Sequence, residues 1–330
     1  MKFTEEDIRP QKIFNEYLAL AAKDSIDYFK NTQREDVKCY SCNKNLEINW
    51  VVKHGFEYKK CTNCHSILVS PRPNLEAFNA YYSDSPSTEF WATSFYKYTE
   101  AARREKLWKP KAQMIKEKIE QYHQDNKIQN IIDIGGGYGV FVEEMSKIMD
   151  VNFTVIEPSI HLAKICKEKG FDVIEKFMES IIKDDLPNTP KCFVSFELFE
   201  HLHNPTLFLN NVLSCMDSGD LFIFTTLSGI GIDIQILKEN AKAISPPHHL
   251  NFFNPKSISF LLEKNQFIVL EISTPGKLDM NILNNSLDKI QDPYWKTLFD
   301  YSDDKDLDLL QSMIVKSKLS SHMMVCCKKK

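Results

Sequence analysis

The chain has 330 residues, of which 43% are hydrophobic and 26% are charged, and its formal net charge is -4. These values exclude a largely disordered chain, and the slightly acidic balance argues against a broad basic surface for nucleic acid, although a local basic groove stays open. The sequence shows no signal or transit peptide pattern and no run of about 18 apolar residues, so it predicts a cytoplasmic protein without a membrane segment.

The N-terminal part is predicted to combine helices with a small cysteine-rich module. Apolar residues at helical spacing over 10–31 indicate one or two helices. Short strand-like segments follow over 37–69 and contain four cysteines. The sequence Ser-Pro-Arg-Pro at 70–73 cannot continue regular structure and marks a module boundary.

The cysteines of this module have the spacing C-x2-C-x18-C-x2-C and are Cys39, Cys42, Cys61 and Cys64. Cysteines of a cytoplasmic protein stay reduced, so two such pairs predict a tetrahedral zinc site that supplies folding energy to a short segment. Four thiolates leave no open coordination position, which indicates a structural metal; an iron–sulfur or redox centre is the alternative. Asn43 and His65 follow the pairs where glycine is common, so local strain or hydrogen bonding is expected there.

The next segment is rich in aromatic residues and leads into a charged helix, predicted over about 99–123. Its large rings either form a wall over a sugar or pack between helices, and this choice stays open: they are Tyr81, Tyr82, Trp91 and Tyr96. We expect this segment to be a connector or lid.

From residue 129 onward, short β-rich runs alternate with helical patterns, which predicts an α/β fold with a mainly parallel sheet and helices on both faces. Seven strands are expected, at 130–134, 152–157, 171–174, 191–197, 219–226, 267–273 and 322–328. A helical insert is predicted over about 277–321.

The first of these strands runs directly into a glycine-rich turn, Gly135-Gly-Gly-Tyr-Gly139, and a helix follows. Glycines allow a tight turn and a close approach to a ligand, and the amides at the helix start favour polar or anionic groups. Glu157 ends the next strand, where it can accept hydrogen bonds from the two hydroxyls of a ribose. The sequence therefore predicts a nucleoside ligand. An NAD-binding unit is the alternative, although it prefers G-x-G-x-x-G over the D-x-G-x-G-x-G found here.

That turn resembles the first motif of class I S-adenosylmethionine (SAM)-dependent methyltransferases, and the resemblance covers about residues 129–328. It implies a seven-stranded Rossmann-like sheet whose last strand is inserted antiparallel. The residues it implies for cofactor binding are Asp133, Gly135, Gly137, Gly139, Glu157 and Glu197. With the cysteine module added, we expect three parts: helices and zinc ribbon at 1–73, the connector at 74–128, and the SAM-dependent methyltransferase domain at 129–330.

The fourth strand of the domain ends in Glu197-Leu-Phe-Glu200-His201, and the carboxyl ends of such strands line the ligand crevice. This run resembles the E-x-x-E-H of small-molecule methyltransferases and of a small-RNA terminal methyltransferase, and His249 belongs to a run that resembles an H-x-x-F element. The resemblance implies that Glu197, Glu200, His201 and His249 hold Mg²⁺ or another divalent ion. Alternatively, His201 or His249, near Glu200, acts as general base, or these residues only bind loop backbone.

The predicted function is therefore methyl transfer from SAM to a hydroxyl of a small molecule, sugar or sugar nucleotide. The segments at 273–279 and 320–323 resemble a bacterial zinc-ribbon subgroup of surface-glycan or secondary-metabolite pathways, which fixes no substrate. An RNA-modifying methyltransferase is the first alternative, and a cofactor-binding or partner-binding module without catalysis is the second.

Overall fold

The computed structural model describes residues 3–123 and 128–330. It divides into two compact units, each built from several stretches of chain. Unit 1 takes the residues up to Ala101 together with Leu227–Ile258 and Ser273–Met323, and unit 2 takes Ala102–Thr226, Ser259–Ile272 and Met324–Lys330. The predicted domain boundaries after residues 73 and 128 stay a prediction, and residues 124–127 of the expected connector lie outside the described residues.

Unit 2 contains most of a seven-stranded sheet with the order β12-β13-β10-β9-β6-β7-β8. The strands are β6 (Asn130–Ile134), β7 (Asn152–Ile156), β8 (Asp172–Ile174), β9 (Lys191–Phe196), β10 (Leu221–Leu227), β12 (Phe267–Ser273) and β13 (His322–Lys329). All seven expected strands are confirmed, and β13 lies between β12 and β10 as an inserted last strand. The pairs β10–β9, β9–β6, β6–β7 and β7–β8 are parallel.

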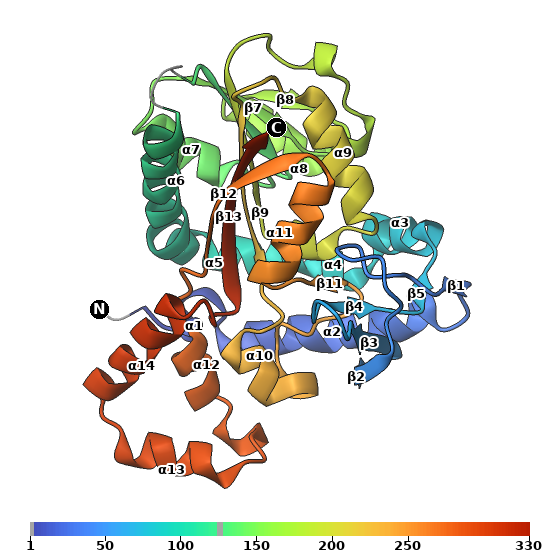
Figure 1. Cartoon of the computed structure of the whole chain (residues 1–330), viewed down its shortest axis with the longest axis vertical. Helices are drawn as coiled ribbons and strands as arrows, with labels where there is room; N and C mark the ends of the chain where they lie inside the picture. The colour runs from blue at the N-terminus through green and yellow to red at the C-terminus, as the bar shows by residue number, and fades with distance from the viewer. Residues whose placement is uncertain (1–2, 124–127) are drawn as a thin grey trace. The chain divides into compact units, whose positions relative to one another are not determined.

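Helices cover both faces of this sheet, with α6 and α7 on one side and α9 and α11 on the other (Figure 1). Their bounds are α6 (Lys109–Tyr122), α7 (Val140–Ser146), α8 (Ile160–Glu168), α9 (Pro205–Cys215) and α11 (Pro255–Lys264), with short 3-10 helices η3 (Met178–Ser180), η4 (Lys183–Asp185) and η5 (Phe199–His201). Strands β6 and β9 are buried along their whole length, because both of their faces carry apolar side chains under helices.

The charged helix expected over about 99–123 is interrupted. The chain forms α5 (Tyr96–Arg103), a π-helical segment η2 (Arg104–Trp108) and then α6. Pro110 lies in the first turn of α6, where its missing N–H is tolerated, whereas in the interior of one long helix it would remove a hydrogen bond.

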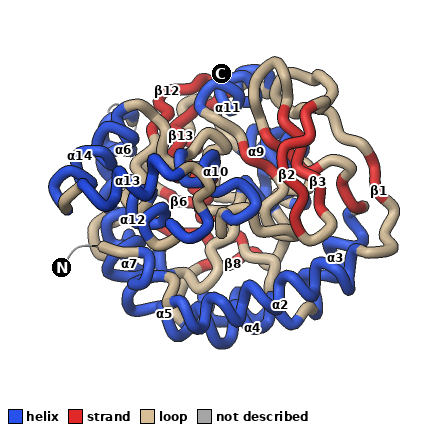
Figure 2. Tube along the Cα trace, turned by 90° about the horizontal axis from the view of Figure 1, so that it is seen from below, coloured by secondary structure: helices blue, strands red, loops and turns tan. Residues whose placement is uncertain are grey.

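Unit 1 begins with α1 (Glu5–Ile8) and the long helix α2 (Gln11–Phe29). Helix α2 packs against α4 (Pro86–Phe90), as Figure 2 shows, and α3 (Leu75–Asp84) and the π-helical η1 (Trp91–Phe95) lie on either side of α4 in the chain. Tyr81 and Tyr96 are buried in this region, so they pack between helices. Their role as part of a sugar-binding wall receives no support.

The cysteine-rich module of unit 1 forms a four-stranded antiparallel sheet of order β11-β4-β3-β2. Its strands are β2 (Ile48–Lys53), β3 (Phe56–Lys60), β4 (Ile67–Val69) and β11 (Asn251–Phe252), and β2 and β3 lie side by side in Figure 2. Strand β11 comes from a segment almost 200 residues further along the chain and was not expected from the sequence. Two further short strands, β1 (Arg34–Glu35) and β5 (Arg72–Pro73), pair with each other antiparallel. In the sequence, β1 precedes β2 and β5 follows β4.

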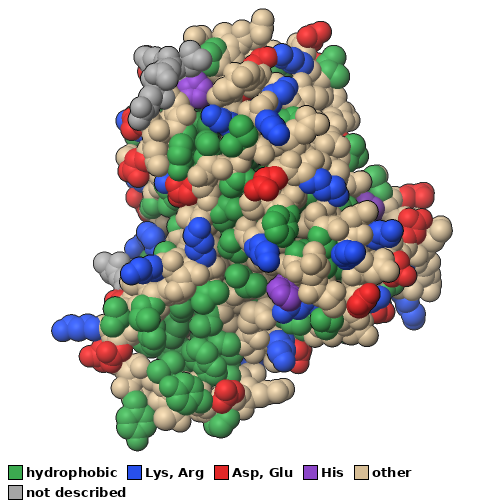
Figure 3. All heavy atoms as spheres, in the orientation of Figure 1, with side chains coloured by type: hydrophobic (Ala, Val, Ile, Leu, Met, Phe, Trp, Pro, Cys, Tyr) green, Lys and Arg blue, Asp and Glu red, His purple; other side chains and the backbone are tan. Residues whose placement is uncertain are grey.

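The insert predicted to be helical is helical, with further elements α10 (Ile232–Leu237) and η6 (Lys238–Asn240) preceding it in unit 1. It contains α12 (Asp279–Asn284), η7 (Leu287–Lys289), α13 (Pro293–Tyr301) and α14 (Asp304–Lys316). Apolar side chains gather on the visible face of this insert (Figure 3). The insert also carries large exposed apolar residues such as Tyr301 and Leu309. None of the helices in residues 3–123 and 128–330 combines the length and the hydropathy that a membrane span requires.

Candidate active site and four-cysteine centre

The glycine turn of unit 2 joins the carboxyl end of β6 to the start of α7. Gly135, Gly137 and Gly139 have φ values of 73°, 55° and 68°, a left-handed conformation that favours glycine. A Cβ atom added at Gly137 would meet no atom within 4 Å, so the backbone there borders open space. The sequence rule that glycines let a ligand approach the backbone closely therefore fits Gly137 best.

Gly136 matters for a different reason, which the sequence motif did not show. A Cβ atom added at Gly136 would lie 2.6 Å from Cγ1 of Val155 and 3.0 Å from Oδ2 of Asp133. Since these side chains belong to the buried ends of β7 and β6, the turn can only pass over them at a residue without a side chain.

Glu157 is the first residue after the neighbouring strand β7, and its carboxylate binds the glycine turn. The Gly137 N–H donates to Oε2 of Glu157 and the Ser159 N–H donates to Oε1, both at 2.9 Å. Each carboxylate oxygen has a further lone pair, so the predicted bonds from ribose hydroxyls remain chemically available. Burial raises the pKa of Glu157, and the two amide bonds oppose this rise.

Asp133 is buried below the same turn, and its Oδ2 atom has no hydrogen-bond partner among the described residues. Burial raises the pKa of Asp133 to about 7, the charge of Glu157 adds to this rise, and Lys111 opposes it. A buried carboxyl without a full set of partners is costly in a resting protein, so it marks a place where a polar ligand group can be accepted.

The second group of predicted residues lies at the carboxyl end of β9, next to β6 in the sheet. Glu197 has a left-handed backbone conformation, with φ 52°, and its Oε1 accepts a hydrogen bond from the Thr225 hydroxyl at 2.7 Å. The added Cβ of Gly135 would lie 3.3 Å from Leu198, so the run from Glu197 to His201 begins beside the glycine turn.

Lys111 of α6 is a member of this group that sequence reasoning missed. Its Nζ atom lies 3.4 Å from Oε1 of Glu197 and 4.8 Å from the ring centre of Phe196, so a cation from a distant helix meets the end of β9. No local sequence pattern distinguishes this lysine from the other lysines of the same helix.

Glu200 is buried on η5, and the Thr226 hydroxyl donates to its Oε2 atom at 2.9 Å. Burial raises the pKa of Glu200 to about 8, the charge of Glu197 adds to the rise, and Thr226 and Lys111 oppose it. Near neutral pH this carboxyl is therefore largely protonated and can donate a hydrogen bond. His201 follows on the same turn and is half-buried.

His249 lies in unit 1, in the loop before β11, whereas Glu197, Glu200 and His201 lie in unit 2. Its Nδ1 atom is 2.6 Å from the carbonyl oxygen of Ala243. A carbonyl can only accept, so Nδ1 carries the proton and Nε2 of the neutral ring has the lone pair that a base or a metal ligand needs. The four-residue divalent-ion site that spans both units stays a prediction.

The four predicted cysteines come together in unit 1, with the paired Sγ atoms of Cys39 and Cys64 at 3.3 Å and those of Cys42 and Cys61 at 3.4 Å. All four sulfur atoms lie within 4.8 Å of one another. Tetrahedral zinc with bonds of about 2.3 Å requires sulfurs about 3.8 Å apart, so the donor set fits zinc in chemistry and spacing. The group could hold a zinc ion.

The two halves of the cysteine group have matching backbones. Asn43 and His65 both have φ 60°, and their N–H groups donate to the carbonyls of Cys39 at 2.7 Å and Cys61 at 3.0 Å. The strain and local hydrogen bonding expected at these two positions are therefore present, since each residue occupies a left-handed position without being glycine.

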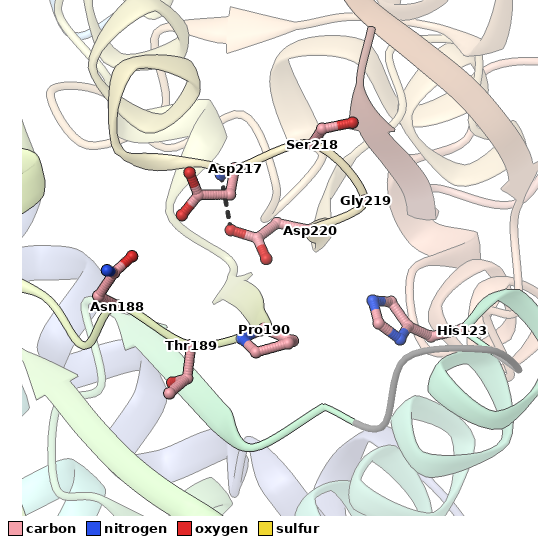
Figure 4. Close-up of a pocket in the computed structure, with 8 residues that line it drawn as sticks. All are labelled: His123, Asn188, Thr189, Pro190, Asp217, Ser218, Gly219 and Asp220. Carbon is pink, nitrogen blue, oxygen red and sulfur yellow. Dashed lines mark hydrogen bonds between the residues drawn. The ribbon is translucent and has the colours of Figure 1, made fainter.

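A pocket of about 210 Å³ lies at the amino ends of β9 and β10 (Figure 4). The glycine turn, in contrast, follows the carboxyl end of β6. Its acidic side chains are already paired: the ammonium group of the buried Lys191 lies 3.0 Å from Asp217 and 3.4 Å from Asp220. The Asp217 N–H also donates to Asp220 at 2.8 Å. These contacts link the loop before β10 to the start of β9, and none of the predicted site residues lines the pocket.

Comparison with known families gives one match by sequence profile. The profile described as "Methyltransferase domain" matches residues 98–272, which is more than half of the chain. A search of curated proteins finds no match.

Several solved structures have a similar fold. An O-methyltransferase from a trans-AT PKS multienzyme of Brevibacillus brevis is 15% identical, with 71% of this chain and 76% of that chain covered and a TM-score of 0.45. A possible histamine N-methyltransferase from Thermotoga maritima is 15% identical, with 72% and 98% covered and a TM-score of 0.45. The plantazolicin methyltransferase BamL is 12% identical, with 73% and 93% covered and a TM-score of 0.48. Likenesses of this size identify no substrate.

Proposed function

The chain belongs to the methyltransferase-domain family and is a SAM-dependent methyltransferase, and on this basis we propose that it transfers the methyl group to a hydroxyl of a small molecule, such as a sugar or sugar nucleotide. The observation that carries the proposal is the position of the ionisable run 197–201, which begins beside the glycine turn in unit 2. A hydroxyl needs a base to become a good nucleophile, and this run offers acid–base groups next to the methyl donor.

On the donor side, Glu157 binds the ribose hydroxyls and Gly137 lets the cofactor approach the backbone. The other proposed contacts to SAM are made by Asp133, Gly135, Gly139 and Glu197. Two features support this assignment: the open space at Gly137 and the unpaired Oδ2 atom of Asp133.

On the acceptor side, His201 or His249 removes the proton while the hydroxyl oxygen attacks the methyl carbon. The bond between that carbon and the sulfonium sulfur breaks, and its electron pair leaves neutral S-adenosylhomocysteine. Glu200, whose pKa is raised to about 8 by burial, can donate a hydrogen bond in the site when it is protonated. The fixed tautomer of His249 supports its candidacy as base. Mg²⁺ or another divalent ion held by the Glu and His side chains is the alternative that activates the hydroxyl.

The assignment is tested by supplying labelled SAM together with hydroxyl-bearing metabolites, sugars and sugar nucleotides. We expect the label in an ether product. Of the variants His201→Gln and His249→Gln, the one that removes the base should lower kcat at least about a hundredfold. Glu157→Ala should mainly weaken SAM binding in calorimetry. Tight binding of NADH without binding of SAM would contradict the proposal. Full activity of protein that metal analysis shows to hold a single zinc ion per chain and no other divalent ion would exclude the divalent-ion route.

A further inference from the structure

The loop 246–254, which carries His248 and His249, is attached to the cysteine module by backbone pairing. Strand β11 of this loop pairs antiparallel with β4, with Asn251 opposite Leu68 and Phe252 opposite Ile67. The Val69 N–H also donates to the Leu250 carbonyl at 3.0 Å. A strand of two residues cannot persist alone, so β11 depends on the strand that it joins.

A direct bond connects the loop to one of the cysteine pairs. Nδ2 of Asn254 donates to the Cys64 carbonyl at 2.8 Å, and both residues are buried. The Cys64 carbonyl belongs to the turn whose shape is set by the Cys61 and Cys64 sulfurs. The His65 N–H also donates to the Cys61 carbonyl in this turn. A metal ion bound by the Cys61 and Cys64 sulfurs would hold the turn, and with it the Cys64 carbonyl, in place.

Two buried side chains, Tyr58 of β3 and Arg72 of β5, bind the loop as well. The Tyr58 hydroxyl donates to the His249 carbonyl at 2.9 Å. The Arg72 guanidinium donates to Oδ1 of Asn251 at 2.8 Å and to the Leu250 carbonyl at 3.4 Å. These two side chains thus bind the loop at His249 itself and at the next two residues.

The two histidines of the loop have different surroundings. His248 is buried, with its Nε2 atom 2.6 Å from the Tyr81 hydroxyl, so it anchors the loop to α3. His249 is less buried, and its Nδ1 atom lies 2.6 Å from the Ala243 carbonyl oxygen. The structure of this loop therefore orients the Nε2 atom of His249.

Resting on the proposed role of His249, we infer that the four-cysteine module is a metal-dependent positioning element for the loop 246–254. Zinc fixes the turn at Cys64, the turn and β4 fix β11, and β11 fixes the histidine. Zinc acts here only through the loop and touches no reacting atom. The segment after β10 holds the far end of the loop separately, because the Gly229 N–H donates to Phe253 at 2.6 Å.

Hydrogen exchange of the full-length protein, followed by mass spectrometry, tests the coupling without any substrate. Zinc removal with a chelator should raise exchange about tenfold or more in peptides covering 246–254 as well as 39–66, and leave peptides covering 130–156 unchanged. Faster exchange at 39–66 with no change at 246–254 would overturn the inference. Restoring zinc should restore the protection.

Chelation could unfold unit 1 beyond the loop, so the zinc-loaded Asn254→Asp variant tests the bond between the loop and Cys64 with the metal in place. It keeps Oδ1, which accepts from the Lys256 and Ser257 amides, but replaces the donor to Cys64 with an acceptor. We expect faster exchange at 249–252, kcat lower by about tenfold or more, and KM for SAM within about twofold of the wild-type value.

Asn265→Asp is the matched control, because Nδ2 of the buried Asn265 donates to the Leu261 carbonyl at 2.7 Å and both residues belong to unit 2. It should leave exchange at 249–252 and kcat unchanged, and equal effects in both variants would overturn the inference. The readout also separates the two proposals. If the loop exchanges faster but kcat stays the same, the catalytic role of His249 is refuted and the positioning role of the module stands. If exchange in the loop does not change, the positioning role is refuted and the role of His249 stands.

Discussion

Two neighbouring glycines of the cofactor turn require glycine for different physical reasons. Gly136 has no room for a side chain, because Val155 and Asp133 lie directly below it. Gly137 has room, but its φ of 55° and the open space beside it suit a backbone that a ligand approaches. The family motif predicts glycines at this turn, while only the packing separates a glycine that has no room for a side chain from one that borders open space.

Gly136→Ala should therefore lower the free energy of unfolding by about 1–3 kcal/mol, through overpacking against Val155. Gly137→Ala should cost about 1 kcal/mol for its left-handed backbone and also weaken SAM binding at least tenfold. Urea unfolding and calorimetry measure both effects. Gly55→Ala is the control, since Gly55 has φ 77° and open space in a turn of unit 1. Equal SAM affinity in the Gly55 and Gly137 variants would contradict the assignment.

The raised pKa of Asp133 predicts that the stability of the protein depends on pH. Its pKa of about 7 in the folded protein exceeds the usual value of about 4 in an unfolded chain, so its stabilising contribution is complete below about pH 4 and is lost as the pH rises through about 7. Between about pH 4 and pH 7, the free energy of unfolding should fall less in Asp133→Asn than in the wild type, by on the order of 1–3 kcal/mol. Urea titrations without SAM at several pH values measure this, with the exposed Asp150→Asn as control. Parallel curves for Asp133→Asn and the wild type would refute it.

At the scale of elements, the connector helix α6 brings a cation to the end of strand β9. Lys111 lies at the first turn of α6, after the π-helical segment that ends at Trp108. Its ammonium group contacts Glu197 and opposes the burial-driven rise in the pKa of both Asp133 and Glu200, so one helix position influences three carboxyl groups.

Lys111→Met should lower kcat/KM for methyl transfer by about tenfold and move its pH profile upward, because Asp133 and Glu200 would then ionise at higher pH. Lys111→Arg keeps the positive charge and should restore most of the activity and the wild-type profile. The measurement is kcat/KM from pH 5 to 9 for both variants. Equal defects in the two variants would show that the shape of the side chain matters and its charge does not.

At the scale of the whole molecule, the net charge of -4 opposes binding to a polyanion. Filter binding at about 50 and 200 mM salt should show no RNA affinity that falls steeply with salt, and labelled SAM should transfer no methyl group to RNA. Small-molecule extracts tested in parallel are the positive control. Salt-sensitive RNA binding accompanied by RNA methylation would favour the alternative function.

The sequence by itself determined the strands of the seven-stranded sheet, the glycine turn and the cysteine group, because alternation, turn chemistry and cysteine spacing are local properties of the chain. Only the tertiary structure decided that β11 joins the cysteine module, that Lys111 meets Glu197, and that Gly136 lies over Val155. These contacts join residues from about 20 to almost 200 positions apart. They depend on how whole elements pack, and no local pattern in a single sequence records that packing.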